Sequence, residues 1–371
     1  MNRVTQTGYV SALLSRSAGT VRNLSDLRRS LLRRMLRLAA LGIGTTLLLV
    51  LALSLWSFAV ARWQHAHNPV PGSFYTVEGR QMHLDCSGTG SPTVILEAAA
   101  SAPWSEWRQV QPGLSQQTQV CSYDRAGHGW SQPRTGPRDA ETIVGELHSL
   151  LNQAGAKPPL VLVGHSAGGL YVREYAREFP SEVVGVALIE SSSPRQIDEL
   201  PGFRAMYEDD KREAKWEIWK DRLRVWSGSE RLLVHCRVPP KDFPGWAAQY
   251  DAMACRPDYV DTDECELDYF EQSSKQAERL TGLGSKPLLV ITRDPDFRKG
   301  LSARALSYIP VWDAEQEASK SLSSLSWRVI ARNSGHMVPH DRPDLIVSEM
   351  SYLIVYLRGG PAPPFGTTTT K

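Results

Sequence analysis

The segment Leu160–Leu170, with the sequence LVLVGHSAGGL, limits the possible fold of this chain more than any other part. It begins with an apolar run that is typical of a strand buried on both faces of a parallel sheet. A G-x-S-x-G pattern centred on Ser166 follows, and apolar residues then return at helical spacing. A serine at such a strand–turn–helix junction needs a strained backbone, and flanking glycines allow the close packing that the turn imposes. The segment predicts a nucleophilic hydroxyl at the carboxyl edge of a sheet.

Further β-rich runs surround this strand. They lie at residues 73–77, 81–86, 93–97, 119–123, 183–189, 287–291 and 327–331. Stretches with helical spacing of apolar residues lie at 141–154, 170–179 and 345–357. After an opening hairpin, strands alternate with helices, which predicts an α/β protein with a mostly parallel, eight-stranded sheet and helices on both faces.

The first 61 residues differ in composition from the rest. Residues 1–37 hold eight arginines and one acidic residue, about +7 in net charge, which leaves about −5 for the remainder of a chain whose total is +2. The basic charge belongs to this leader, so no nucleic-acid groove is expected on the main domain. Residues 38–61 carry no charged side chain, and about 20 residues suffice to cross a bilayer as a helix. We therefore predict a transmembrane helix at 38–61, with the lipid bilayer as a partner.

The distribution of arginine also predicts the orientation of this helix. Five arginines lie shortly before it, whereas Arg62 stands nearly alone after it. The positive-inside rule then keeps residues 1–37 in the cytoplasm as a basic leader and sends everything after Ala61 to the extracytoplasmic side. The rival interpretation is a cleaved signal peptide, because Ala59-Val60-Ala61 fits a small-x-small cleavage site. We favour a single-pass anchor, since the apolar run exceeds the usual signal core and the leader is long.

The rest of the chain divides into four segments after a linker. Residues 62–72 form the expected linker, and the core is expected in two parts, at 73–194 and 286–358. The intervening residues 195–285 are far longer than an ordinary connection and contain four tryptophans, which predicts a helical cap or lid. The tail 359–371 is rich in proline, glycine and threonine and is expected to be disordered.

A nucleophilic serine requires a base, expected downstream of it in the chain. His336 ends the run Asn333-Ser334-Gly335-His336, directly after the last predicted strand, where an imidazole can reach back over the sheet edge. His340 is a lesser alternative, because it lies at the start of the next helix. We predict His336 as the base.

The acid of such a site would lie between the serine and the histidine. Asp296 is the first choice and Asp294 the second, both directly after the strand at 287–291. Either could instead form a turn beside Pro295. Glu190, at the end of the preceding strand, is a third candidate.

With these motifs, the chain resembles the α/β-hydrolase superfamily, in the branch of esterases, lipases and proline-iminopeptidase-like serine hydrolases. The resemblance covers roughly residues 73–358 and rests on G-H-S-A-G around Ser166 and S-G-H at 334–336. The run Tyr123–Ser131, YDRAGHGWS, is similar to the superfamily's D-x-x-G-x-G-x-S loop. The resemblance implies an α/β-hydrolase fold and a triad of Ser166, Asp296 and His336.

The resemblance also implies two backbone donors for an oxyanion. One is Ala167, at the start of the helix after the nucleophile. The other follows the third strand, where a His-Gly pair is usual and this chain has Glu97-Ala98-Ala99-Ala100-Ser101. Ala99 or Ala100 would then supply the N–H, although a Cβ restricts φ at this position.

These features imply hydrolysis of a carboxylic ester or amide through an acyl-enzyme, without a metal or organic cofactor. The tryptophans of the cap and the membrane helix are compatible with a lipophilic small-molecule substrate. An acyltransferase with the same triad is one alternative. A catalytically inactive, membrane-tethered binding protein is another, because the oxyanion loop departs from the usual pattern.

All five cysteines lie after the predicted membrane helix, on a side where disulfides are permitted. The resemblance places the second and fourth predicted strands side by side, which implies a disulfide between Cys86 and Cys121. The remaining cysteines have no assigned pairing: Cys236, Cys255 and Cys265.

Overall fold

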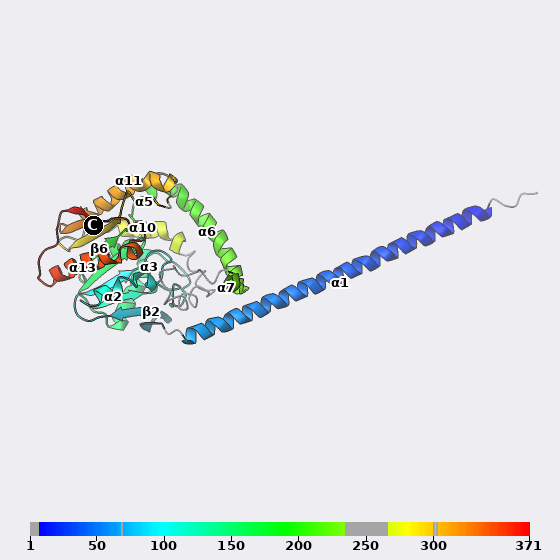
Figure 1. The fold of residues 1–371 in the computed structure, drawn as a ribbon, viewed down its shortest axis with the longest axis horizontal. Helices are drawn as coiled ribbons and strands as arrows, with labels where there is room; N and C mark the ends of the chain where they lie inside the picture. The colour runs from blue at the N-terminus through cyan, green and yellow to red at the C-terminus, as the bar shows by residue number, and fades with distance from the viewer. Residues whose placement is uncertain (1–6, 68–69, 234–265, 300, 302) are drawn as a thin grey trace, which may run out of the picture.

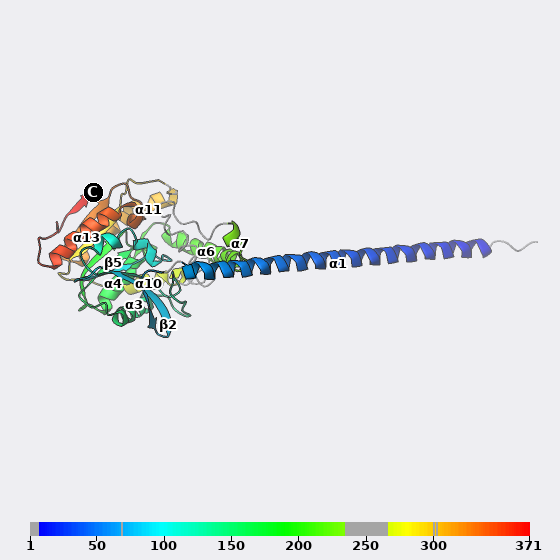
Figure 2. The same cartoon turned by 60° about the horizontal axis from the view of Figure 1, so that its bottom comes forward.

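A nine-stranded sheet lies between layers of helices, and one very long helix leaves this body at the N-terminus (Figures 1 and 2). The computed structural model describes residues 7–67, 70–233, 266–299, 301 and 303–371.

The strands are β1 (Ser73–Val77), β2 (Arg80–Ser87), β3 (Thr93–Glu97), β4 (Val120–Tyr123), β5 (Leu160–His165), β6 (Val183–Ile189), β7 (Leu288–Arg293), β8 (Ser326–Ala331) and β9 (Thr368–Thr370). They are ordered β1-β2-β4-β3-β5-β6-β7-β8-β9. β2 pairs antiparallel with β1 and β4, and all other neighbours are parallel. The eight predicted strands are confirmed, and β9 is an addition to them.

The helices within the described residues are α1 (Thr7–His67), α2 (Gln111–Leu114), α3 (Ala140–Ala154), α4 (Gly168–Glu178), α5 (Gln196–Glu199), α6 (Phe203–Trp226), α7 (Ser229–Leu233), α10 (Phe270–Glu278), α11 (Ala303–Ala318), α12 (Val338–Asp341) and α13 (Pro343–Leu357). Successive strand residues point to opposite faces of the sheet. Ile95 and Leu162 join the core beneath α3 and α4. Leu96 and Val163 join the core beneath α13. The fully apolar strands are therefore buried on both sides.

α1 is one helix of 61 residues that contains the predicted membrane segment 38–61. It continues to His67, so residues 62–67 extend the helix and do not belong to a linker. No glycine or proline occurs at these positions, and the first proline comes at position 69. Between Asp26 and Trp63 the helix is long and apolar enough to cross a membrane, and its most apolar part is not buried in the protein. A signal sequence meets the same criteria.

The predicted cap at 195–285 contributes α5, α6, α7 and α10. α5 and α10 lie over the sheet together with α11, which follows β7, whereas α6 leads to α7 beside α1 (Figure 1). Trp246 and the three cysteines without an assigned pairing lie outside the described residues.

The tail 359–371, which the composition predicts to be disordered, is ordered. Thr368–Thr370 forms β9, the edge strand of the sheet, and pairs in parallel with β8. Phe365 packs edge-on against Trp327, with 5.6 Å between the ring centroids. Because β-branched threonines suit an extended edge strand, pairing with β8 outweighs the disorder that proline and glycine favour.

Cys86 and Cys121 are directly opposite each other in the antiparallel pair of β2 and β4, and they form the implied disulfide. It joins residues 35 positions apart. This bond limits the freedom of the unfolded chain.

We expect Cys86→Ala/Cys121→Ala to lower the free energy of unfolding by about 2–4 kcal/mol, measured by denaturant unfolding. Dithiothreitol should destabilise the wild-type protein by a similar amount and have little effect on the double variant. Equal sensitivity of both proteins to dithiothreitol would contradict this assignment of the stabilising bond.

Candidate active site

Ser166 lies at the turn between β5 and α4 with a φ of +51°, in the left-handed region. The turn requires glycine at two flanking positions, because neighbouring backbone atoms leave no room there for a side chain. A Cβ on Gly164 would lie 2.5 Å from the carbonyl oxygen of Gly168. A Cβ on Gly168 would lie 2.6 Å from the carbonyl oxygens of Glu97 and Ala98. Close packing thus explains both glycines of the G-x-S-x-G sequence. The turn leaves Ser166 accessible at the carboxyl end of β5.

His336 lies in the loop between β8 and α12, and its Nε2 is 3.0 Å from Ser166 Oγ. Asp341 holds this loop, because its carboxylate accepts hydrogen bonds of 3.0 Å from the Ser334 hydroxyl and from the Gly335 N–H. The structure therefore brings the predicted nucleophile and the predicted base within hydrogen-bonding distance.

The carboxylate beside His336 belongs to Glu190, the third candidate from the sequence. Glu190 Oε1 lies 3.7 Å from His336 Nδ1, and the Glu190 side chain is 1% exposed. Glu190 Oε2 accepts a hydrogen bond of 2.8 Å from the backbone N–H of Arg293, which orients the carboxylate. Glu190 follows β6, the parallel neighbour of β5, and has a φ of +42°. The distance of 3.7 Å allows an ion pair, and such contacts often shorten when substrate binds.

Asp296, the first choice from the sequence, is not beside the base. Its side chain is exposed, and its backbone N–H donates to Asp294 Oδ1 at 2.9 Å. Asp294 Oδ2 in turn accepts from the backbone N–H of Asn333 at 3.0 Å. The Asp294 carboxylate thus holds the turns after β7 and β8 together. Because β7 is one strand farther from β5 than β6 is, the carboxylate after β6 lies closer to the serine.

Ala100 and Ala167, two of the three residues expected to bind an oxyanion, line the same cavity as Ser166. Among the described residues, neither of their N–H groups has a protein acceptor. The third, Ala99, differs, because its N–H donates to Glu106 Oε2 at 2.8 Å. The geometry therefore favours Ala100 over Ala99.

A buried ion pair of Glu106 and His165 connects two loops of the site. Glu106 Oε1 lies 2.7 Å from His165 Nδ1, and His165 Nε2 donates to the carbonyl oxygen of His336 at 2.8 Å. Burial disfavours the charged imidazole, but Glu106 outweighs burial and raises the pKa of His165. Burial also opposes the carboxylate, yet His165 lowers the pKa of Glu106. Since Glu106 also accepts from Ala99, the pair fixes the loops of Ala100 and His336 relative to each other.

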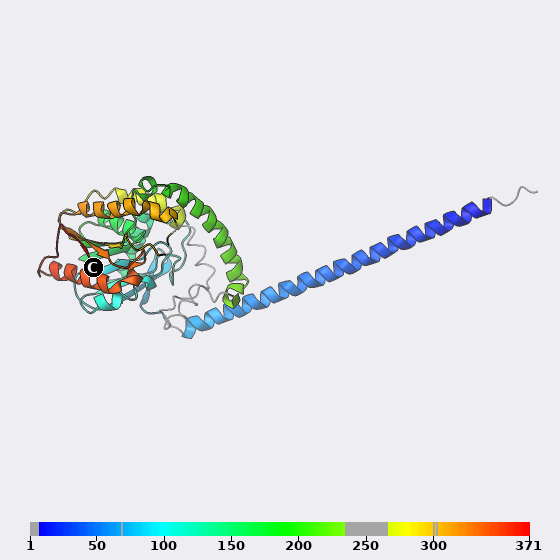
Figure 3. The same ribbon diagram turned by 45° about the horizontal axis from the view of Figure 1, so that its top comes forward.

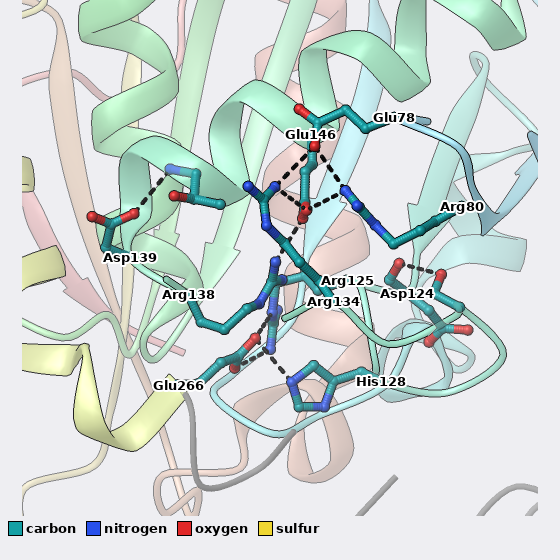
Figure 4. A network of polar contacts seen from close by, with 12 residues as sticks. Glu78, Arg80, Asp124, Arg125, His128, Arg134, Arg138, Asp139, Glu146 and Glu266 are labelled. Carbon is teal, nitrogen blue, oxygen red and sulfur yellow. Dashed lines mark hydrogen bonds and ion pairs between the residues drawn. The ribbon is translucent and has the colours of Figure 1, made fainter. Parts of the chain in front are cut away.

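A second buried network joins the cap to the core (Figure 4). Arg125 Nε and Nη2 donate to the two carboxylate oxygens of Glu266, just before α10, at 2.6 and 3.0 Å. Arg125 Nη1 donates to Glu97 at 2.6 Å, and His128 Nε2 lies 2.9 Å from Glu266. Burial opposes the charge on Glu266, but Arg125 and His128 outweigh it and hold the pKa of this carboxyl well below its usual range.

The same network holds the backbone of the loop after β3. Arg125 donates to the carbonyl oxygens of Ala98 and Ala99 at 3.0 and 2.7 Å. Glu266 accepts from the Ser101 N–H at 3.1 Å. The loop that lacks the usual His-Gly pair is therefore held from both sides, by Arg125 of the core and by Glu266 of the cap. Sequence reasoning did not identify this role for either residue.

A cavity of about 340 Å³ lies over Ser166 and His336. Ala100, Ala167 and Glu190 also line it. Its walls are mainly apolar and come from α6, α10, α11 and the segments beside them: Phe203, Met206, Tyr207, Leu267, Phe270, Leu301, Tyr308, Ile309 and Trp312. An apolar cavity with a few convergent polar groups is typical of a small-molecule site. Within the described residues, no cluster of three His, Cys, Asp or Glu side chains could hold a metal ion.

The profile of the Alpha/beta hydrolase family matches residues 86–349 of the chain. This match spans both parts of the core and includes the serine turn, Glu190 and His336. The chain belongs to the Alpha/beta hydrolase family.

Two solved hydrolase structures cover most of this family member. The epoxide hydrolase CorEH covers 77% of the chain and 99% of its own length, with a TM-score of 0.57 and 18% identity. A thermophilic esterase from Thermogutta terrifontis covers 78% of the chain and 99% of its own length, with a TM-score of 0.55 and 20% identity. At these identities the likeness confirms the fold.

One sequence relative matches a shorter stretch. An uncharacterized protein of Schizosaccharomyces pombe is 29% identical over 167 residues, which cover 37% of this chain and 31% of that protein. The chain thus spans about a third of the length of this relative.

Glu190 and Asp296 can be distinguished by matched amide variants. We expect Glu190→Gln to lower the rate of p-nitrophenyl butyrate hydrolysis by about 10³- to 10⁴-fold, because the imidazolium would lose its buried counter-charge. Asp296→Asn, an exposed change, should stay within about twofold of wild type. The opposite ranking of the two variants would favour Asp296 as the acid.

Replacing Glu106 tests the buried ion pair through its pH dependence. The raised pKa of His165 stabilises the fold below that pKa, and the lowered pKa of Glu106 stabilises it above that pKa. We therefore expect Glu106→Gln to reduce the free energy of unfolding most between pH 4.5 and 6.5, the two reference values, by about 3–5 kcal/mol. The loss should shrink above the raised pKa of His165.

Glu182→Gln is the matched control for this experiment, because Glu182 pairs with the part-exposed His148 at 3.1 Å. Its effect should stay below about 1 kcal/mol. A pH-independent loss in Glu106→Gln would contradict a charged pair.

Proposed function

We propose that the protein is a serine hydrolase that cleaves a carboxylic ester or amide through an acyl-enzyme. Ser166 attacks the carbonyl carbon while His336 takes its proton. Glu190 holds the imidazole and stabilises its cation. His336 then protonates the leaving group, and it later activates the water that releases the acid. The observation that carries this proposal is the strained turn that presents Ser166 Oγ 3.0 Å from His336 Nε2.

The tetrahedral intermediate carries a negative oxygen, which the N–H groups of Ala100 and Ala167 would bind. Each such donor contributes about 3–4 kcal/mol to the transition state in comparable sites. The position of both residues on the cavity beside Ser166 supports this assignment. The nucleophile also separates this proposal from epoxide hydrolysis and dehalogenation, which use an aspartate at the position of Ser166.

The cavity walls favour a lipophilic substrate. Aromatic and aliphatic side chains of α6, α10 and α11 provide apolar surface around the serine. Burial of apolar surface is worth about 25 cal/mol per Å², so an acyl chain or aromatic group would bind here more favourably than a charged one.

We further propose that α1 anchors the protein in a bilayer, with residues 1–37 in the cytoplasm and the hydrolase domain on the other side. The support is the apolar stretch that lies outside the core and the excess of arginine before it. A disulfide between β2 and β4 agrees with an extracytoplasmic domain, because such bonds persist in oxidising compartments.

The first test is labelling of the full-length protein in detergent with a fluorophosphonate probe. Wild type should be labelled at Ser166, and both Ser166→Ala and His336→Ala should lose about 10⁴-fold or more in labelling rate. Ser193→Ala is the matched control, because this serine donates to Glu315 and should leave labelling intact. A folded wild-type protein that stays unlabelled would refute an activated serine and favour an inactive binding protein.

A further inference from the structure

The outward face of α6 is apolar. Trp216, Trp219, Leu223 and Trp226 are 56%, 48%, 51% and 63% exposed. At about 100° per residue, these four side chains fall within a stripe roughly 80° wide along the helix. Ile218, which is buried, lies on the other side of the helix. Contiguous exposed apolar side chains of this kind mark an interaction surface.

Basic side chains border this apolar stripe. By the same helical geometry, Lys215 and Arg222 lie along one edge and Lys220 along the other. Lys220 Nζ lies 5.6 Å from the ring centre of Trp216. Lys220 also pairs with Glu217, and Lys215 with Asp268. A tryptophan stripe with a polar border of this kind is the pattern of a helix that lies in the headgroup region of a membrane.

The end of α6 and the residues that follow it, including α7, contact α1. The Ser54 hydroxyl of α1 donates to the carbonyl oxygen of Trp226 at 2.7 Å, and Arg231 Nε donates to the Ser57 hydroxyl at 3.3 Å. Gly228 comes so close to α1 that a Cβ there would lie 2.6 Å from the Leu53 carbonyl oxygen. Figure 3 shows α6, in green, curving from the body of the protein to α1.

These contacts fix the depth of α6 relative to the apolar segment. Leu53, Ser54 and Ser57 precede Ala61, the last residue of that segment, by four to eight positions. A helix rises 1.5 Å per residue, so the contacts lie about 6–12 Å inside the end of the segment. Interfacial helices bury their apolar face about 5–10 Å into a bilayer. The depth of the contacts within the apolar segment therefore agrees with the usual depth of an interfacial helix in a bilayer.

We propose that the tryptophan face of α6 docks on the bilayer that α1 spans, with its tryptophans at the level of the lipid headgroups. This inference rests on the proposed anchoring by α1. The first turns of the same helix contribute Phe203, Met206 and Tyr207 to the cavity over Ser166. The docked helix therefore joins the membrane surface to the wall of the cavity, which fits a substrate drawn from the bilayer.

The test uses the full-length protein in vesicles of phosphatidylcholine and phosphatidylglycerol, with and without bromine on the acyl chains near the headgroup. Trp216→Phe/Trp219→Phe/Trp226→Phe removes only the emission of these three tryptophans, so the wild-type spectrum minus the variant spectrum isolates it. We expect most of this difference emission to be lost in brominated vesicles. Retained fluorophosphonate labelling of the variant shows that it is folded.

Trp104→Phe provides a matched difference spectrum, because Trp104 is 5% exposed and packs against His83. Its difference emission should not be quenched. Unquenched emission from the α6 tryptophans, with the chain still resistant to carbonate extraction, would overturn the docking alone. A concentration-dependent dimer with unquenched emission would assign the face to a second copy of the chain and overturn it too. Release by carbonate would overturn the anchor and the docking together, while labelling of Ser166 would still report on the hydrolase.

Discussion

The fold of the site depends on one crowded turn. Ser166 donates its N–H to the Ile189 carbonyl oxygen at 3.2 Å, and its own carbonyl oxygen accepts from Ser192 at 2.9 Å. The turn is thus attached to the end of β6 on both sides of the strained residue. Its glycines approach neighbouring carbonyl oxygens so closely that no other residue fits. The cost of the left-handed φ is of order 1–3 kcal/mol, and these contacts offset it locally.

Buried charges then position the loops that meet at this turn. Ser166, Glu190 and His336 follow parallel strands and therefore lie at one edge of the sheet. The loops after these strands have no regular secondary structure that would orient their side chains. Glu106 with His165, and Arg125 with Glu266, supply that orientation through charged hydrogen bonds to backbone groups. In a buried site such bonds are stronger than in water, and a missing partner is costly. Because Glu266 belongs to the cap, its pair with Arg125 joins the cap to the loops of the site.

The sequence was a good guide wherever the signal was local. Apolar runs identified the core strands, and G-x-S-x-G predicted the turn, because both patterns follow from neighbouring residues. Asp296 was the first choice for the acid because an aspartate-rich turn follows the predicted strand at 287–291, whereas the structure places Glu190, which follows β6, beside His336. The partners of Glu106 and Glu266 are 59 and 141 residues away, so no local pattern contains them. The tail 359–371 was predicted to be disordered because its composition does not show that Thr368–Thr370 pairs with β8.

The continuous course of α1 has a consequence for how such an enzyme would meet its substrate. The helix ends at His67 and β1 begins at Ser73, which leaves five residues between them. Fully extended, these reach less than about 20 Å. With α1 in a bilayer, this short connection would hold the hydrolase domain close to the membrane surface. Its search would be two-dimensional, and its rate would follow the number of substrate molecules per area of membrane, not their concentration in solution.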